Sequence, residues 1–232
     1  MTASLSIIIP ALNEEAGIAA ALEALADLRR CGHEVIIVDG GSSDRTAERA
    51  RRLADVVLAA PRGRAAQMNA GAAQATGDIL VFLHADTRLP PAADRLIVDG
   101  LRRSRCLWGR FDVAIAGSNP MLRVVAATMN LRSRTSGIAT GDQAIFVTRG
   151  AFADCGGYPD IPLMEDIALS RRLKRISRPL CLKARVTASG RRWEQHGITR
   201  TILLMWQLRL AYFLGAEPAE LARRYGYVPR KG

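Results

Sequence analysis

Short apolar runs alternate with helical segments along the first part of the chain. Apolar runs at 5–9, 34–38, 56–59 and 79–83 are each closed within two residues by proline, glycine or a polar residue, and each predicts a buried strand. Helices are predicted between them, over 15–30, over 44–53 with Asp44 as a capping residue, and over 64–75. This alternation indicates an α/β fold whose sheet is mostly parallel, with right-handed crossovers.

After about Pro90 the regular alternation of strands and helices becomes less clear. Helices are predicted over 92–104, 120–133 and 165–176, and strands over 108–115, 144–148 and 180–188. A long apolar helix over 199–214 and a short helix after Pro218 complete the pattern. Because no linker composition separates the two halves, we expect a single domain over 1–232.

Composition and charge narrow the class of protein. The chain has 232 residues, of which 49% are hydrophobic and 24% charged, as expected for a packed globular core. Its net charge of +11 favours anionic partners such as nucleic acid, phosphorylated small molecules or acidic lipid headgroups, although a generally basic proteome would explain it equally well. Aromatic residues make up only 5% and do not interleave with basic runs, so we expect no nucleic-acid partner.

The cysteines and the N-terminal sequence indicate the cellular compartment of the protein. Four cysteines lie far apart without a CxxC pair, and no secretory signal is recognisable, so we expect reduced thiols and a cytoplasmic protein. No segment reaches the roughly 18 uninterrupted apolar residues of a membrane span.

Polar residues follow three of the predicted strands, in the stretches PALNEE (10–15), DGGSSD (39–44) and HADT (84–87). In open parallel sheets, ligands bind beyond the carboxyl ends of the strands, so these stretches are candidate binding loops. The carboxylate of Asp39 could accept hydrogen bonds from a nucleotide base or ribose; alternatively, Asp39 and Ser42 only cap the next helix. The turn does not match GxGxxG, which disfavours a dinucleotide site.

Asp86 is a candidate ligand for a divalent cation. Mg²⁺ often takes only one or two carboxylates together with substrate phosphates, and Asp39 is expected on the same edge of the sheet. His84 could be a further ligand or a general base, although a single histidine in such a place more often makes a local hydrogen bond.

Five stretches of sequence occur in a fixed order from Ser6 to about Arg175: SIIIPALNEE, VIIVDGGSSDRT, GRAAQMNAGAAQATGDILVFLHADT, GDQAIFVTRGAF and MEDIALSRRLKR. By these motifs the chain resembles a family-2 glycosyltransferase with the GT-A fold. It is most similar to the short bacterial branch whose metal motif reads His-Ala-Asp and whose tail carries SGRRWEQHG. The resemblance implies a nucleotide-sugar donor, most commonly a UDP-sugar, a Mg²⁺ or Mn²⁺ cofactor, and a hydroxyl acceptor on a lipid or small molecule.

The resemblance also implies a role for each part of the domain. Residues 1–90 would bind the nucleotide sugar, 91–190 would hold the acceptor and the catalytic groups, and 191–232 would form a helical tail. We expect the donor to lie against the following residues: Pro10, Ala11, Asn13, Glu14, Asp39, Gly40, Gly41, Gly63, Arg64, Asn69, Ala85, Asp86, Gly141, Asp142, Gln143, Arg191, Arg192 and Trp193. Asp86 matches the last carboxylate of the family's DxD metal motif, and the turn at 141–143 matches the loop beneath the transferred sugar.

The expected reaction needs positive charge at the leaving diphosphate and a base at the acceptor hydroxyl. Arg64, Arg191 and Arg192 are candidate phosphate ligands, since guanidinium groups bind phosphate oxygens in a fork. The Arg191–Arg192 pair could equally be a solvated turn. Asp166, paired with Glu165, matches the family's catalytic base, and a single base predicts inversion at the anomeric carbon. Without the resemblance, the same acidic pair reads simply as the N-terminus of a helix.

The sequence departs from the family pattern in two places. His84 replaces the first metal-site aspartate, which keeps open the alternative of a non-catalytic binding protein. RRW at 191–193 replaces the QxxRW motif of processive synthases, so we expect a single transfer. A sugar-nucleotide pyrophosphorylase is a further alternative, but it usually needs a glycine-rich basic loop where this chain has PALNEE.

The apolar stretch at 199–215 is too short to span a bilayer. It could lie in the interface at the inner face of the membrane, with Trp206 and Tyr212 at headgroup level. Alternatively, it packs on the sheet or in the seam of a homodimer.

Overall fold

The computed structural model of the protein describes residues 3–227, apart from the side chains of Arg192 and His196. The end of the predicted tail, 228–232, lies outside the described residues. None of the helices between residues 3 and 227 combines the length and the apolar character needed to cross a bilayer.

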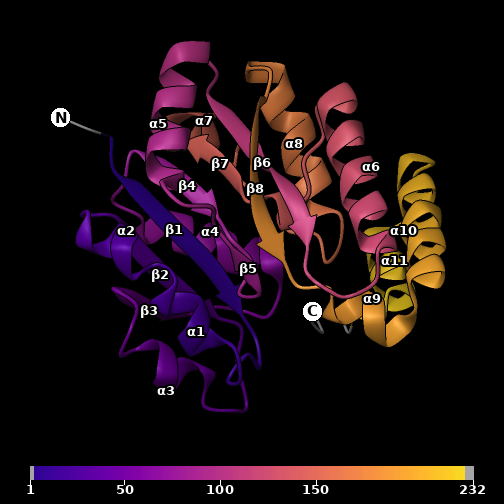
Figure 1. The fold of residues 1–232 in the computed structure, drawn as a ribbon, viewed down its shortest axis with the longest axis horizontal. Coiled ribbons are helices and arrows are strands. Elements are labelled where there is room, and N and C mark those ends of the chain that lie inside the picture. The colour runs from indigo at the N-terminus through magenta and orange to yellow at the C-terminus, as the bar shows by residue number, and fades with distance from the viewer. Residues whose placement is uncertain (1–2, 228–232) are drawn as a thin grey trace.

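A single sheet runs through the molecule (Figure 1). In the described part of the chain its eight strands follow the order β3 (Val56–Ala59), β2 (Glu34–Asp39), β1 (Leu5–Ala11), β4 (Ile79–Phe82), β7 (Ile145–Thr148), β6 (Trp108–Ile115), β8 (Leu180–Ala188) and β5 (Thr87–Arg88). The first four are parallel to one another, β7 is antiparallel to both of its neighbours, β6 and β8 are parallel, and β5 is antiparallel to β8. The mostly parallel α/β sheet is therefore confirmed.

Helices cover both faces of this sheet. They are α1 (Ile18–Glu23), α2 (Ala26–Arg30), α3 (Thr46–Ala50), α4 (Arg64–Gln74), α5 (Ala93–Ser104), α6 (Met121–Ser136), α7 (Arg149–Asp154), α8 (Glu165–Ile176), α9 (Arg191–His196), α10 (Ile198–Phe213) and α11 (Pro218–Arg224). Figure 1 shows α9, α10 and α11 gathered at one side of the molecule, beyond β8 and α6.

Side chains alternate between two core layers, as strands buried on both faces require. On one face Ile7, Ile37 and Val81 pack in the same cluster as Ile18 of α1 and Ile97 of α5. On the other face, one cluster joins Ile8, Ile36 and Leu80 with Met68 of α4 and Leu169 of α8. Both clusters draw on strands from each half of the chain, so the sheet and its core are continuous.

Two expectations about the first sixty residues need correction. The helix predicted over 15–30 is two short helices, because the chain turns at Ala24 and Leu25; the turn brings Leu25 into the core, while α2 buries none of its own residues. The first strand does not end at Pro10 but continues to Ala11. Its pairing with β4 stops at Ile8, so beyond that residue β1 has β2 alone beside it, and a proline is tolerated there.

The parallel strands end together at one edge of the sheet. Ala11 of β1 is in register with Asp39 of β2, and the amide of Gly40 donates to the carbonyl of Ala11 at 2.9 Å. Because β4 is parallel to β1, the segment that follows it, from His84 to Asp86, leaves the sheet at the same edge. The three predicted binding loops therefore converge.

Candidate active site

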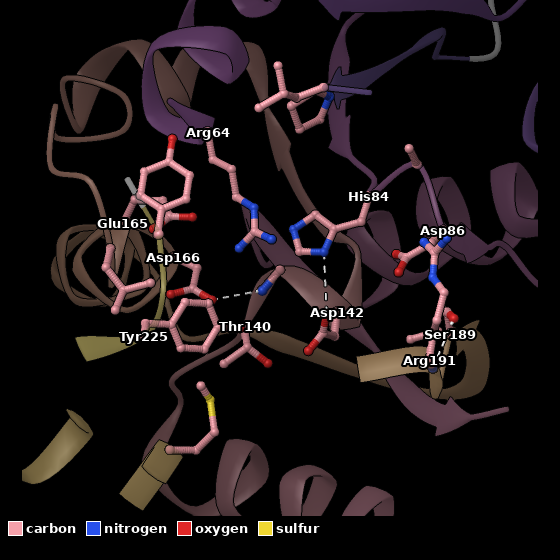
Figure 2. Close-up of a pocket in the computed structure, with 18 of the residues that line it drawn as sticks. Arg64, His84, Asp86, Thr140, Asp142, Glu165, Asp166, Ser189, Arg191 and Tyr225 are labelled. Atoms are coloured by element: carbon pink, nitrogen blue, oxygen red, sulfur yellow. Dashed lines mark hydrogen bonds and ion pairs between the residues drawn. The ribbon is translucent and has the colours of Figure 1, made fainter. Parts of the chain in front are cut away.

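A cleft of about 450 Å³ opens at the carboxyl ends of β1 and β4 (Figure 2). Its walls come from the loops after these strands, the start of α4, the turn at 140–142, the start of α8, the segment at 188–195 and the tail helices. Thirteen of the residues expected at the site line it: Pro10, Ala11, Glu14, Arg64, His84, Ala85, Asp86, Gly141, Asp142, Glu165, Asp166, Arg191 and Trp193. The side chain of Arg192 lies outside the described residues.

Other expected donor residues do not line the cleft. Asn13 is exposed, and its Oδ1 accepts from the amide of Ser43 at 2.9 Å, which joins two of the loops. The side chain of Asn69 is hydrogen-bonded to the backbone of Tyr158. Its Nδ2 donates to the carbonyl at 2.8 Å, and its Oδ1 accepts from the amide at 3.0 Å. Gly63 precedes α4 with φ of +142°, so its role is to let the backbone enter that helix.

Gln143 also departs from expectation. Its side chain is fully buried and hydrogen-bonded to Asn130 and to the backbone of Thr140. It is therefore not among the residues that line the cleft. The motif GDQ contributes Gly141 and Asp142 to the site, while its third residue supports the turn from behind.

The loop after β2 lies beside the cleft rather than in its wall. The carboxylate of Asp39 accepts from the amides of Gly41 at 3.1 Å and Ser42 at 3.0 Å, and from the Ser42 hydroxyl. These contacts stabilise the turn itself; Asp39 does not cap the next helix, because α3 begins only at Thr46 and has no side-chain cap. Gly41 takes φ of +87°, which favours glycine, and a Cβ on Gly40 would lie only 3.1 Å from the Gln67 amide. The turn and its packing thus account for both glycines without a ligand.

His84 faces the turn at 140–143. Its Nδ1 lies 3.3 Å from Oδ1 of Asp142, while its buried Nε2 has no hydrogen-bond partner among the described residues. The ring packs so closely on Gly141 that a Cβ there would lie 2.3 Å from Nε2. Burial acts to raise the pKa of Asp142, but the charges of His84, Arg64 and Arg132 outweigh it and hold that pKa below its usual value.

Asp86, Glu14 and Arg191 form a second charged group. Asp86 is exposed and makes no hydrogen bond or ion pair with the described residues, and Glu14 lies 3.7 Å from Arg191. Burial raises the pKa of Glu14, and the charge of Asp86 adds to this while Arg191 opposes it. Between residues 3 and 227 no three His, Cys, Asp or Glu side chains are grouped to hold a metal ion. A cation here therefore needs ligand oxygens as well as Asp86, which is how Mg²⁺ and Mn²⁺ sites at substrate phosphates are built.

Glu165 and Asp166 begin α8 at the other end of the view in Figure 2, close to Arg64. Asp166 accepts from the amide of Gly141 at 2.9 Å and from that of Ile167 at 2.7 Å. Burial, reinforced by the charge of Asp166, raises the pKa of Glu165 to about 7. Burial also raises the pKa of Asp166, against the effect of its two amide donors. The cleft thus holds carboxylates that bind protons more readily than usual.

The tail supplies part of the cleft that the sequence did not predict. Thr201, Met205 and Arg209 of α10 line it, and so do Tyr225 and Tyr227 after α11. Arg209 could have indicated this part of the cleft from the sequence, since a charged residue inside an apolar helix needs a polar environment. Tyr227 is fixed by Arg62, whose guanidinium lies 5.6 Å from the ring centre.

Known proteins are similar to this chain in sequence and in fold. The model of glycosyl transferase family 2 matches residues 6–154. Undecaprenyl-phosphate 4-deoxy-4-formamido-L-arabinose transferase of Pectobacterium carotovorum is 37% identical over 99 residues, which are 38% of this chain and 30% of the relative. The probable glycosyltransferase YdaM of Bacillus subtilis is 26% identical over 236 residues, covering 91% of this chain and 55% of YdaM. The chain thus spans less than two thirds of these relatives.

Solved structures give the same picture. The mannosyltransferase PcManGT of Pyrobaculum calidifontis, in complex with GDP-Man and Mn²⁺, superimposes with a TM-score of 0.66 at 21% identity, over 99% of this chain and 66% of that one. S. aureus TarS 1-349 in complex with UDP gives 0.65 at 19% identity, over 80% and 60%. These likenesses establish the GT-A fold, and because the family model covers well over half of the sequence, the chain belongs to glycosyl transferase family 2.

Proposed function

We propose that the protein transfers one sugar from a nucleotide-diphosphate donor, most commonly a UDP-sugar, to an acceptor hydroxyl. The observation that carries this proposal is that one cleft holds two separate charged groups, Asp86 with Arg191 and Glu14, and Glu165–Asp166 with Arg64. The first group suits a diphosphate with a cation, and the second suits a proton transfer. Residues 1–90 would supply the donor side, 91–190 the acceptor and catalytic side, and 191–232 the tail that covers it.

The donor would lie along the carboxyl ends of β1 and β4. Pro10, Ala11 and Glu14 line this wall, and Asp39 stands at the same edge with one oxygen, Oδ1, bonded only to the Ser42 hydroxyl. That oxygen retains capacity to accept a hydrogen bond from a base. Similar structures solved with UDP or with GDP-Man support a nucleotide sugar without fixing the base.

Asp86 would hold a Mg²⁺ or Mn²⁺ ion together with diphosphate oxygens. Its exposed, unpaired carboxylate fits a hard cation that completes its shell with substrate and water. Bound there, such an ion supplies positive charge that neutralises the departing diphosphate. Arg191 and Arg64 would add guanidinium contacts to the phosphate oxygens.

Asp166 would serve as the base. As the acceptor oxygen forms its bond to the anomeric carbon, the bond from that carbon to the diphosphate breaks and the hydroxyl proton passes to the Asp166 carboxylate. The amide of Gly141, 2.9 Å from Oδ2, holds the carboxylate in place. One base and one displacement give inversion, and the RRW tail favours a single transfer over polymerisation.

The acceptor side suggests a lipid-borne hydroxyl at an acidic membrane surface, such as the inner face of a cytoplasmic membrane. One face of α10 lines the cleft, whereas the opposite face exposes an apolar stripe of Leu203, Trp206, Leu210, Phe213 and Leu214, each 57–79% exposed. Exposed arginines, Arg200 on α10 and Arg224 on α11, flank Leu203. This pattern suits anionic headgroups better than a second copy of a chain whose net charge is +11.

The test is turnover of a donor panel. Purified protein is incubated with UDP- and GDP-sugars, with and without Mn²⁺, and the released nucleotide is identified. We expect one donor to yield its nucleoside diphosphate slowly even without an acceptor, and Asp86→Ala to abolish this while Asp154→Ala, on the exposed end of α7, does not. Release of pyrophosphate would instead indicate nucleotidyl transfer, and binding without turnover of any donor would indicate a binding protein.

A further inference from the structure

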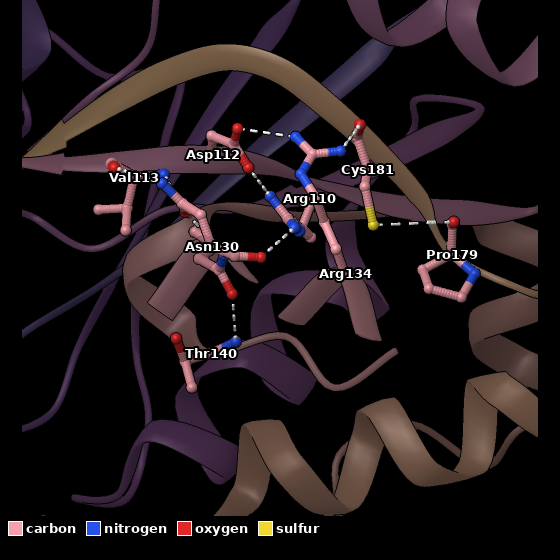
Figure 3. Close-up of polar contacts among 9 residues, drawn as sticks. Arg110, Asp112, Val113, Asn130, Arg134, Thr140, Pro179 and Cys181 are labelled. Carbon is pink, nitrogen blue, oxygen red and sulfur yellow. Dashed lines mark hydrogen bonds and ion pairs between the residues drawn. The ribbon is translucent and has the colours of Figure 1, made fainter. Parts of the chain in front are cut away.

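A buried polar network lies behind the turn at 140–143, outside the cleft (Figure 3). Its first part joins β6 to α6. Arg110 has no exposed side-chain area and pairs with Asp112, whose other oxygen accepts from Arg134 at 2.7 Å. Arg110 also donates to the carbonyl of Asn130 at 3.2 Å. None of these four residues lines the cleft.

Asn130 is the centre of this network. Its Oδ1 accepts from the amide of Val113 at 2.8 Å, and its Nδ2 donates to the carbonyl of the same residue at 2.9 Å, so the side chain is clamped to β6 in one orientation. The same Oδ1 accepts from Nε2 of Gln143 at 3.3 Å. The strand thereby fixes the position of the Gln143 side chain.

Gln143, held by Asn130, in turn contacts the backbone of the turn at 140–143. Its Oε1 accepts from the amide of Thr140 at 3.2 Å, while Nε2 is held by Asn130. The next amide along the chain, that of Gly141, donates to Oδ2 of Asp166 at 2.9 Å. A continuous series of contacts therefore runs from the backbone of β6, through Asn130 and Gln143, to the carboxylate assigned above as the base.

We propose that Asn130 and Gln143 are positioning residues for Asp166, acting by holding the Gly141 amide against its carboxylate. This role rests on the proposed function, because it presumes that Asp166 takes the acceptor proton. A fixed amide donor stabilises the ionised carboxylate and limits its rotation. Both effects depend on the conformation of the turn, which Gln143 holds from outside the cleft.

The charged surroundings of Asp166 do not depend on this network. Titratable or charged groups that interact with it include Glu165 on α8, Asp142 on the turn, Arg64 on α4, Arg132 on α6 and Tyr158 before α8, and Tyr225, which interacts with Arg64, lines the same cleft. An uncharged substitution at Asn130 or Gln143 leaves all of these groups in the chain and adds no new charge, so the amide donor is the contact under test.

The decisive variants are Gln143→Met and Asn130→Leu. Gln143→Met removes both the acceptor for the amide of Thr140 and the donor to Asn130 without adding a charge; Asn130→Leu removes the link to β6. We expect kcat to fall about tenfold or more, and the acidic limb of the kcat–pH profile to move up by as much as about one unit, because the carboxylate loses part of a charge-assisted hydrogen bond. The KM for the donor should change less than kcat.

Arg134→Met is the matched control. It breaks the contact to Asp112 at the far end of the same network, so it should lower the melting temperature without moving the acidic limb. If all three variants lose stability and none shifts the acidic limb of the kcat–pH profile, the network has only a structural role and the proposal is overturned. Should Asn130→Leu not fold, Gln143→Met alone decides the matter.

A second readout does not require turnover. The carboxyl carbon of Asp166, assigned in ¹³C NMR spectra with Asp166→Asn, is titrated in the wild type and in Gln143→Met. A higher titration midpoint in the variant supports the positioning role even if no donor is turned over, and equal midpoints contradict it. A wild type that turns over no donor would count against the proposed function alone.

Discussion

Nδ1 of His84 lies 3.3 Å from Oδ1 of Asp142, so the histidine of the His-Ala-Asp motif faces the turn at 140–143. The resemblance to the family placed an aspartate at position 84. We expect His84→Asp to set two carboxylates against each other and to lower the melting temperature at pH 8 by a few degrees, about 1 kcal/mol. His84→Asn, which can still donate to Asp142, is the matched variant. Equal melting temperatures for the two would contradict the pairing.

Gly141 has no room for a side chain. A Cβ would lie 2.3 Å from Nε2 of His84, so Gly141→Ala must push the ring away and break its contact with Asp142. We expect a loss of activity of at least about tenfold, measured as donor turnover. Gly150→Ala on α7, where a Cβ meets nothing within 4 Å, should leave turnover unchanged. Similar rates for both alanine variants would show that the close packing is unimportant.

Asp86 should determine how much Mn²⁺ stabilises the protein, without contributing to the stability of the ligand-free protein. With saturating UDP and Mn²⁺ at a hundred times its Kd, the wild type should gain about 2.7 kcal/mol of stability by mass action. We expect Asp86→Asn to lose most of the Mn²⁺-dependent part of this gain, because its carboxylate is the proposed ligand. Its melting temperature without ligand should match the wild type, since Asp86 makes no hydrogen bond or ion pair with the described residues. A full Mn²⁺ response in the variant would remove Asp86 from the metal site.

Glu165 predicts a specific dependence of stability on pH. Its pKa in the folded protein is raised to about 7, so the folded state holds the proton more tightly than the unfolded chain. The stabilisation this gives is fully present below pH of about 4.5 and is lost as the pH rises through 7, a change of up to about 3 kcal/mol. Glu165→Gln should therefore melt several degrees above the wild type at pH 8 and close to it at pH 4.5. A constant difference at all pH values would contradict the raised pKa.

The apolar stripe on α10 should bind anionic bilayers. We expect the wild type to sediment with vesicles containing phosphatidylglycerol and much less with phosphatidylcholine alone, and Trp206→Ser with Leu210→Ser to abolish this. Leu131→Ser on α6 is the control, because Leu131 is 63% exposed on another helix. If the wild type ignores vesicles but forms a dimer that the double variant breaks, the stripe is a subunit interface instead.

Hydrophobic periodicity was sufficient to predict most of the elements. The strands at 56–59, 108–115 and 180–188 and the helix at 165–176 have the predicted bounds, because each depends on its own local pattern. The two-residue strand β5 carries no such pattern; it pairs with β8, far along the chain, and only the folded sheet shows it. The break between α1 and α2 likewise depends on how Leu25 reaches the core.

The site was predicted where chemistry and position along a strand coincide. Asp86 lines the cleft because it follows the end of β4, whereas Asp142 and Asp166, which only the resemblance to the family indicated, lie just before the antiparallel strand β7 and at the start of α8. Gln143 belongs to the same motif, but its direction depends on Asn130, a residue that the motif does not contain. Met205 and Arg209 were missed because their place in the cleft results from packing of the tail, which buries Leu208 with Leu163 and Ile167 of the α8 region.

The two walls of the cleft come from distant parts of the chain. The proposed donor wall is built on strands at the centre of the sheet, whereas α10 and α11 are attached at its margin through a separate cluster around Leu221. Substitutions in these helices can therefore reshape the proposed acceptor wall while the central strands stay unaltered. Under the proposed function, one nucleotide-sugar frame could thus be matched to new acceptors by exchange of its peripheral helices.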